Sequence, residues 1–226
     1  MDLRIRFGSI LLLFFAGLGL SLLALLFCAA LGMPSIARTL IAVAVADLSC
    51  VGGYQLLAYD RGWLSLGTRF ATVRASILRA SAAGGILLIL LLAAIARFLT
   101  WVGIELPPLP DSDFATGDLR WLPALFLVIA IIAPAAEELM NRGLLLDWLR
   151  QKMPLWPAIL ISALVFGLMH GIALHSGVSG WLQFGYKTML GIVMACMTVR
   201  YRSLLPSFVF HATHNAFLVI ASLFVT

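Results

Sequence analysis

Long apolar stretches separated by short polar connections run through the whole chain. A membrane-crossing α-helix needs roughly 20 consecutive apolar residues, and several stretches reach that length. The expected spans are residues 7–31, 39–58, 80–99, 121–146, 158–174, 181–199 and 204–225. The pattern therefore predicts an all-α, polytopic transmembrane helical bundle of about seven spans.

Composition agrees with this pattern and leaves no room for a separate soluble domain. Of the 226 residues, 62% are hydrophobic and only 11% are charged, and the mean hydropathy is +1.06. Such a composition is typical of a membrane protein. The net charge of +5 comes mostly from basic residues between the spans, where they report membrane orientation. We therefore expect the lipid bilayer, and no nucleic acid, as a partner.

Positive charge collects in alternate connections, which indicates how the chain crosses the membrane. Cytoplasmic connections carry an excess of Lys and Arg. With the N-terminus inside, the cytoplasmic segments hold Arg4, Arg6, Arg61, Arg69, Arg74, Arg79, Arg150, Lys152, Arg200 and Arg202. The outer segments then hold Arg38, Arg97 and Arg120. This distribution predicts seven spans with the N-terminus inside and the C-terminus outside.

Two connections have a distinct composition. Residues 61–79 contain four arginines and no acid, with apolar residues at helical spacing, which predicts an amphipathic segment on the cytoplasmic surface. Residues 100–120 contain four acids and three prolines, which predicts an acidic outer loop without regular helix. We therefore separate spans 1–3, within residues 1–120, from spans 4–7, within residues 121–226, as two parts of one membrane domain.

Three charges interrupt the fourth apolar stretch. Glu138 and Arg142 are four residues apart, so they share a helix face and can pair. Glu137 lies about 100° around the helix, away from that partner. Because a charge in hydrocarbon is costly, an ionisable residue there is a candidate for function, and Glu137 is the strongest one.

Other polar residues of the last spans are placed at a similar depth. His170 follows Phe166 by four residues in the fifth span, and Asn215 follows His211 by four in the seventh. With a rise of 1.5 Å per residue, Glu137, His170 and His211 lie roughly 12–20 Å from the cytoplasmic ends of their helices. Three helices can therefore present these side chains to one buried cavity.

Hydrolysis is the chemistry that suits this set of side chains. Glu137 can act as a general base on water, with His170 orienting that water or sharing its proton. His211 and Asn215 can donate hydrogen bonds to a developing oxyanion, and Arg142 would hold Glu138. The same imidazoles and carboxylate also suit zinc, and the spacing does not choose between the two. Four further polar residues have ordinary structural readings. Asp47 bonds to a neighbouring helix and His214 is a satisfied neighbour of the site, whereas His175 lies at the outer interface and Lys187 snorkels or pairs with a carboxylate.

The motifs resemble a known family. Residues 137–142 read E-E-L-M-N-R, residues 166–170 read F-G-L-M-H and residues 211–215 read H-A-T-H-N. In this order, on consecutive membrane helices, they resemble the CPBP family, which includes the type II CAAX prenyl endopeptidases and the bacterial Abi (bacteriocin-immunity-like) proteins. The resemblance covers about residues 121–226.

The resemblance implies an intramembrane endopeptidase with a conical cavity open toward the cytosol and the bilayer. It implies that Glu137 is the water-activating base with His170 as its partner, that His211 and Asn215 form the oxyanion site, and that Glu138, Arg142 and Phe166 support them. Members are described as metalloproteases, whereas a glutamate base works without metal. We favour the mechanism without a cofactor, and zinc on Glu137, His170 and His211 is the alternative.

The expected substrate is a membrane-anchored peptide or protein with a CAAX-like or lipidated tail, prenylated in some cases. The expected location is the cell membrane of a bacterium or archaeon, with the active site accessible from the cytoplasmic side. A non-catalytic scaffold, such as an immunity or sensor-partner protein with the same fold, is the competing function. A transporter is a weaker alternative, because the two halves lack matching helices broken by Gly or Pro.

Overall fold

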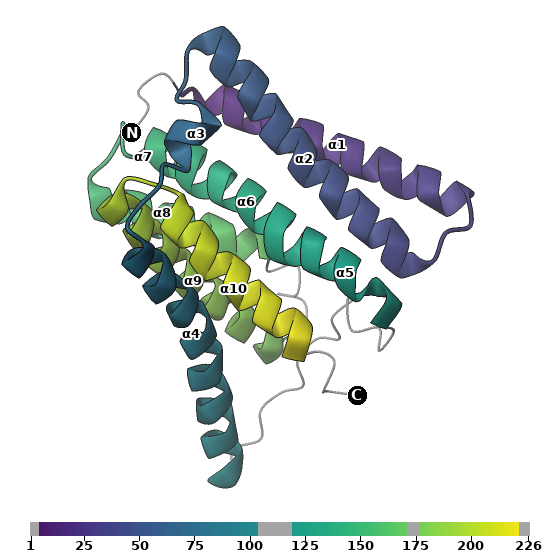
Figure 1. Ribbon diagram of the computed structural model, residues 1–226, viewed down its shortest axis with the longest axis vertical. Coiled ribbons are helices and arrows are strands. Elements are labelled where there is room, and N and C mark those ends of the chain that lie inside the picture. Colours follow the sequence, from purple (N-terminus) through teal and green to yellow (C-terminus); the bar gives the residue numbers. More distant parts are fainter. Residues whose placement is uncertain (1–4, 104–118, 171–176, 222–226) are drawn as a thin grey trace.

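The computed structural model describes residues 5–103, 119–170 and 177–221, and every regular element in these ranges is helical. Helices α1 (Phe7–Ala30) and α2 (Ser35–Arg61) form an antiparallel hairpin along one side of the molecule (Figure 1). Pro34 precedes α2, where its missing N–H leaves no helical hydrogen bond unmade. The first two predicted spans are therefore confirmed as helices, and α2 is longer than expected at both ends.

The basic segment at residues 61–79 does not form the predicted amphipathic element. Arg61 ends α2, α3 (Leu66–Arg69) is a single turn, and Arg79 already lies inside α4 (Ala75–Trp101). Arg69 is buried, with its Nη1 2.6 Å from Asp147 Oδ2 and its Nε donating to Tyr54 Oη at 3.0 Å. Arg69 therefore contacts partners on other helices and does not face the surface, and the cytoplasmic location of the segment stays a prediction.

The electrostatics of Arg69 follow from these contacts. Burial by itself lowers the pKa of the guanidinium. The Asp147 carboxylate and Tyr54 raise it by more, so the pKa of Arg69 lies above its usual value. Arg69 therefore stays charged and ties the connection between α2 and α4 to the central helix. The same connection is held from the other side, because Leu204 N–H donates to Arg69 O at 2.8 Å and Ser203 Oγ donates to Ala71 O at 2.6 Å.

A long central helix carries the charged motif. It runs from Leu119 to Leu149 through η1 (Leu119–Trp121), α5 (Leu122–Leu125), η2 (Phe126–Ile132), α6 (Ala133–Glu138), η3 (Leu139–Leu145) and α7 (Leu146–Leu149). The segments η2 and η3 are π-helical, a pattern common at functional sites. Because Pro134 has no N–H, regular α-helical hydrogen bonding is interrupted just before α6. The predicted loop at residues 147–157 is shorter than expected, since α7 continues to Leu149.

The remaining helices surround the central one. Helix α8 (Leu155–His170) packs against α9 (Val178–Tyr201), and α10 (Leu205–Ala221) lies among α4, α9 and the central helix (Figure 1). Within the described residues, five helices are long and apolar enough to cross a membrane, and α8 and α10 are shorter apolar helices. The chain is therefore an all-helical, multi-pass membrane protein. Most of the predicted outer loop, and His175, lie outside the described residues.

The basic connections gather at one end of the bundle. Phe7 stacks on Trp148 with ring centroids 4.6 Å apart, near the contacts of Arg69 with Asp147 and Leu204. At the opposite end, Ile36 of α2 packs in one cluster with Leu122 of α5. This separation agrees with the predicted division of the connections into two sides, and the membrane orientation itself stays a prediction.

Candidate active site

Glu137 and Glu138, adjacent in sequence, occupy different environments. Glu138 is fully buried, whereas about 23% of the Glu137 side chain is accessible. Helix α6 presents them about 100° apart, so the two carboxylates face different neighbours. Glu137 is thus the carboxylate that a substrate or a water molecule can reach.

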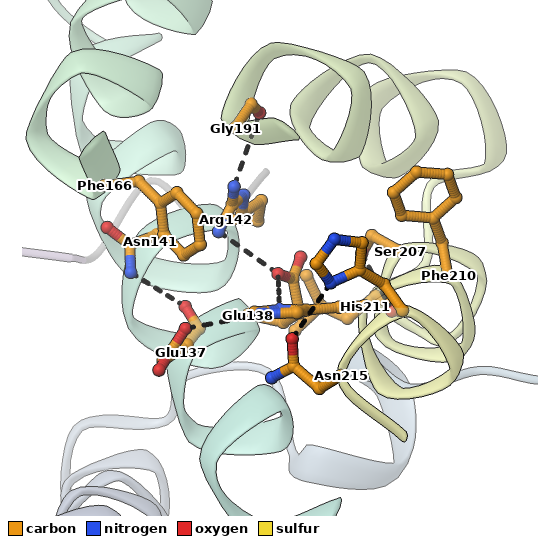
Figure 2. Close-up of polar contacts among 12 residues, drawn as sticks. Glu137, Glu138, Asn141, Arg142, Phe166, Gly191, Ser207, Phe210, His211 and Asn215 are labelled. Carbon is orange, nitrogen blue, oxygen red and sulfur yellow. Dashed lines mark hydrogen bonds and ion pairs between the residues drawn. The ribbon is translucent and has the colours of Figure 1, made fainter. Parts of the chain in front are cut away.

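The inner carboxylate belongs to a closed polar network (Figure 2). Glu138 Oε1 lies 3.1 Å from Arg142 Nη1 and accepts a hydrogen bond from His211 Nδ1 at 3.1 Å. The Arg142 guanidinium also stacks over the Phe166 ring at 4.3 Å, and its Nη2 lies 3.4 Å from Gly191 O. The expected Glu138–Arg142 pair is present, and the sequence alone did not indicate that His211 joins it.

The outer carboxylate faces two imidazoles. Glu137 Oε2 lies 3.4 Å from His170 Nε2 and 3.7 Å from His211 Nε2, and it accepts no hydrogen bond from the described residues. The predicted convergence of Glu137, His170 and His211 from three helices is therefore found in the structure. Phe166 supports both imidazoles, with ring centroids 4.4 Å from His170 and 5.7 Å from His211.

Hydrogen bonds on the far side of each imidazole determine which nitrogen faces Glu137. His170 Nδ1 lies 2.8 Å from Phe166 O, and a carbonyl oxygen can only accept, so this nitrogen carries a hydrogen. His211 Nδ1 likewise donates to the Glu138 carboxylate, which is paired with Arg142. In the neutral form of both rings, each Nε2 then presents a lone pair to Glu137. Three acceptor atoms converge on one point, which suits a molecule that brings its own protons, such as water.

Asn215 is held by its own set of bonds. Its Nδ2 donates to Ile129 O at 2.9 Å, and its Oδ1 accepts from His214 Nδ1 at 3.1 Å. His214 Nε2 in turn contacts the Tyr186 hydroxyl, so His214 is the satisfied neighbour that the sequence indicated. One hydrogen of the Asn215 amide is committed to Ile129, which leaves the second as the only one it can offer to an oxyanion.

Several residues that contribute to the site carry no recognisable sequence signal. Asn141 Nδ2 donates to Glu137 O at 3.0 Å, and Ser162 Oγ donates to Asn141 O at 2.9 Å, so these two support the π-helical turn behind Glu137. Lys187 of α9 and Asp47 of α2 interact electrostatically with Glu137. Single polar residues are common in membrane helices, so their positions in the sequence do not mark them. Only the fold shows that these four lie near Glu137.

Zinc is the alternative ligand for the same side chains. Two imidazoles and a carboxylate are ligand types that zinc accepts. Within the described ranges, however, no three His, Cys, Asp or Glu side chains are grouped so as to hold a metal ion. The residues therefore do not form a ready metal centre in this arrangement, and we derive no step through a metal.

The described residues thus form a multi-pass bundle of apolar helices that holds a Glu–His–His cluster. Residues 119–217 match the family model described as "Type II CAAX prenyl endopeptidase Rce1-like", a little less than half of the chain. This part of the chain is similar to that Rce1-like family. The match includes each of the three motifs.

One bacterial protein is similar to part of the chain. It is 32% identical over 135 residues to the uncharacterized protein YyaK of Bacillus subtilis (strain 168). The aligned region covers 55% of this chain and 44% of YyaK, so the chain spans less than half of the length of that relative. No solved structure matches the chain.

Proposed function

We propose that the protein is an intramembrane endopeptidase that hydrolyses a peptide bond of a membrane-anchored or lipidated substrate. The observation that carries the proposal is the partly accessible Glu137 side chain, whose shielded Oε2 faces the Nε2 atoms of His170 and His211 at 3.4 and 3.7 Å. The match of residues 119–217 to the Rce1-like family model supports it. The substrate class is a peptide with a CAAX-like tail, prenylated or not.

The first step of the reaction is activation of water. A water molecule roughly 2.8 Å from both Glu137 Oε2 and His170 Nε2 completes a triangle with the 3.4 Å edge between these atoms. It donates one hydrogen to each acceptor, so its lone pairs are free for the substrate carbonyl. Glu137 then takes the proton as the water oxygen attacks, and His170, fixed by Phe166 O, keeps the geometry.

Two side chains can stabilise the oxyanion. The second amide hydrogen of Asn215 is one donor. His211 can donate from Nε2 only as an imidazolium, because its Nδ1 hydrogen is bound to Glu138. His211 Nδ1 stays bound to Glu138 while Nε2 faces the position where negative charge develops. In this proposal Glu138, Arg142 and Phe166 position His211 and do not touch the substrate.

The proposed setting is the cytoplasmic half of a bacterial or archaeal cell membrane. The apolar helices that surround the site exclude bulk water, and the accessible fraction of Glu137 is the entry for the substrate. The described residues before the matched segment, 5–103, add helices α1, α2, α3 and α4 to this core.

The test is cleavage by purified protein in liposomes, with a farnesylated CAAX peptide that carries a fluorophore–quencher pair as the probe. Glu137→Ala, His170→Ala and His211→Ala should each abolish cleavage, and Glu137→Gln should do the same with less change in packing. Wild-type protein treated with a chelator should stay active and contain no stoichiometric zinc, because the mechanism uses carboxylate and imidazole only.

The controls separate the alternatives. Thermal unfolding of the Glu137 and His170 variants in detergent should remain close to that of the wild type, since these two side chains are partly accessible. Activity lost with removal of one zinc per chain would replace the glutamate mechanism by the zinc alternative. Unchanged membrane proteomes in cells with Glu137→Gln, together with no cleavage by the wild type, would support the scaffold reading instead.

A further inference from the structure

Asp47 is a partly buried carboxylate that neither the family motifs nor the proposed mechanism uses. It lies in α2, outside the matched residues 119–217. Its Oδ2 is shielded from solvent and has no hydrogen-bond partner among the described residues. An isolated carboxylate in such a place is expected to hold a proton, because burying its charge without a partner costs several kcal/mol.

The packing of α2 places Asp47 beside the site. Leu40, two turns before Asp47, packs in one cluster with Leu125 and Val128. Tyr54, two turns after Asp47, packs in another with Leu139 and Leu144 of η3. Helix α2 and the central helix thus run in the same direction, and α2 contacts α6 (Figure 1). Asp47 lies midway between the two clusters, which places it level with α6.

The charges around Asp47 differ from those around Glu137. The titratable groups that bear on Asp47 are Glu137, across the helix contact, and Cys50 of its own helix. Glu137 itself faces His170, His211 and, more remotely, Lys187. When two carboxyl groups interact in a membrane interior, one of them tends to stay protonated, because two negative charges repel each other there. The proton is expected on the group without a cationic partner, which here is Asp47.

The geometry points to Asp47 as the proton donor to the leaving amide nitrogen, a role that rests on the proposed function. Glu137 accepts a proton from water as the new C–O bond forms. As the C–N bond breaks, the Asp47 carboxyl gives its proton to the departing nitrogen. Glu137 then transfers its proton to the Asp47 carboxylate, which restores both groups and balances the consumption of one water.

The decisive experiment compares leaving groups. Asp47→Asn keeps the size of the side chain but cannot give up a proton. On the farnesylated peptide with a scissile amide, kcat should fall by about 100-fold or more, the scale of general acid catalysis. On the same peptide with a scissile nitrophenyl ester, whose leaving group needs no proton, the rate should stay within a few-fold of wild type. Asp60→Asn, an exposed acid at the end of the same helix, is the matched control and should change neither rate.

The outcomes keep this inference apart from the proposed function. Glu137→Ala should abolish cleavage of both substrates; if it does not, the proposed function fails. Equal losses on amide and ester in Asp47→Asn would show a positioning role and overturn the donor assignment, as would no loss at all.

An infrared measurement is independent of turnover. The carbonyl stretch of a protonated carboxylic acid should be present at neutral pH in the wild type and missing in Asp47→Asn. Absence of that band in the wild type would also refute the assignment.

Discussion

Neighbouring glutamates have different surroundings because a helix turns by about 100° per residue. Glu138 points into the protein, where Arg142 and His211 compensate its charge, and Glu137 points to the accessible side. A buried ion pair of this kind adds little stability by itself, but it fixes a geometry. Here that geometry is the orientation of His211, whose Nδ1 is bound so that Nε2 faces Glu137.

Removing one partner from the buried network should be costly. Arg142→Leu leaves the Glu138 charge buried without its cation, and we expect the free energy of unfolding to fall by about 3–5 kcal/mol. Denaturant titration in mixed micelles measures this loss. The matched control is Arg150→Leu, because Arg150 is partly exposed and 4.0 Å from Asp147, and it should cost less than about 1 kcal/mol. Equal effects of the two substitutions would contradict the role given to the network.

Close contact between helices sets the position of the histidine-bearing α10. Helix α4 carries Gly84 and Gly85, which the sequence marks as small residues suited to tight packing. A Cβ on Gly85 would lie 2.6 Å from Thr213 Oγ1 and would collide with Phe210 O. The carbonyl and the hydroxyl belong to the helical turn that contains His211, so the contact with α4 fixes the position of that turn.

A methyl group at this contact should disturb both stability and activity. Gly85→Ala must push α4 and α10 apart, with an expected loss of about 1–3 kcal/mol in unfolding free energy and reduced cleavage through displaced His211. Gly52→Ala in α2, where no atom lies within 4 Å of the added Cβ, is the control and should leave both unchanged. Unfolding and peptide cleavage, measured on the same preparations, report the two effects. A Gly85→Ala protein that behaves like Gly52→Ala would show that the contact is not tight in the membrane.

Over the complete molecule, the two ends of the bundle differ in charge and in contacts. The connection that contains Arg69, the end of the central helix at Asp147 and the turn before α10 meet at one end. These segments hold most of the basic residues, which favours a cytoplasmic location for that end.

Labelling of single cysteines tests the orientation. Cys28, Cys50 and Cys196 are first replaced, and a cysteine is then introduced at Lys152 or at Met33. Because Lys152 belongs to the basic end, an impermeant maleimide should reach it only after the inner membrane is opened. The cysteine at Met33, at the opposite end, should react in intact spheroplasts. The reverse labelling pattern would invert the orientation, with the basic end facing outward.

The local pattern of the sequence was sufficient to predict the helical spans and the candidate site. Apolar length indicates helices because unsatisfied backbone groups are not tolerated in lipid. Spacing of three or four residues places Phe166 with His170 and Glu138 with Arg142 on shared faces. Equal depth in three helices was enough to predict that Glu137, His170 and His211 meet.

The tertiary structure decided what one-dimensional patterns leave open. Arg69 looked like a surface charge and is buried, because its partners Asp147 and Tyr54 come from distant helices. Tyr186 and Ser162 join the site network only through packing of α9 and α8 on neighbouring elements. The hairpin α1–α2 matched no motif, yet its packing places Asp47 level with Glu137. The physical reason is that a residue's own helix determines its depth and face, whereas the charge it meets across that face depends on which other helices pack there.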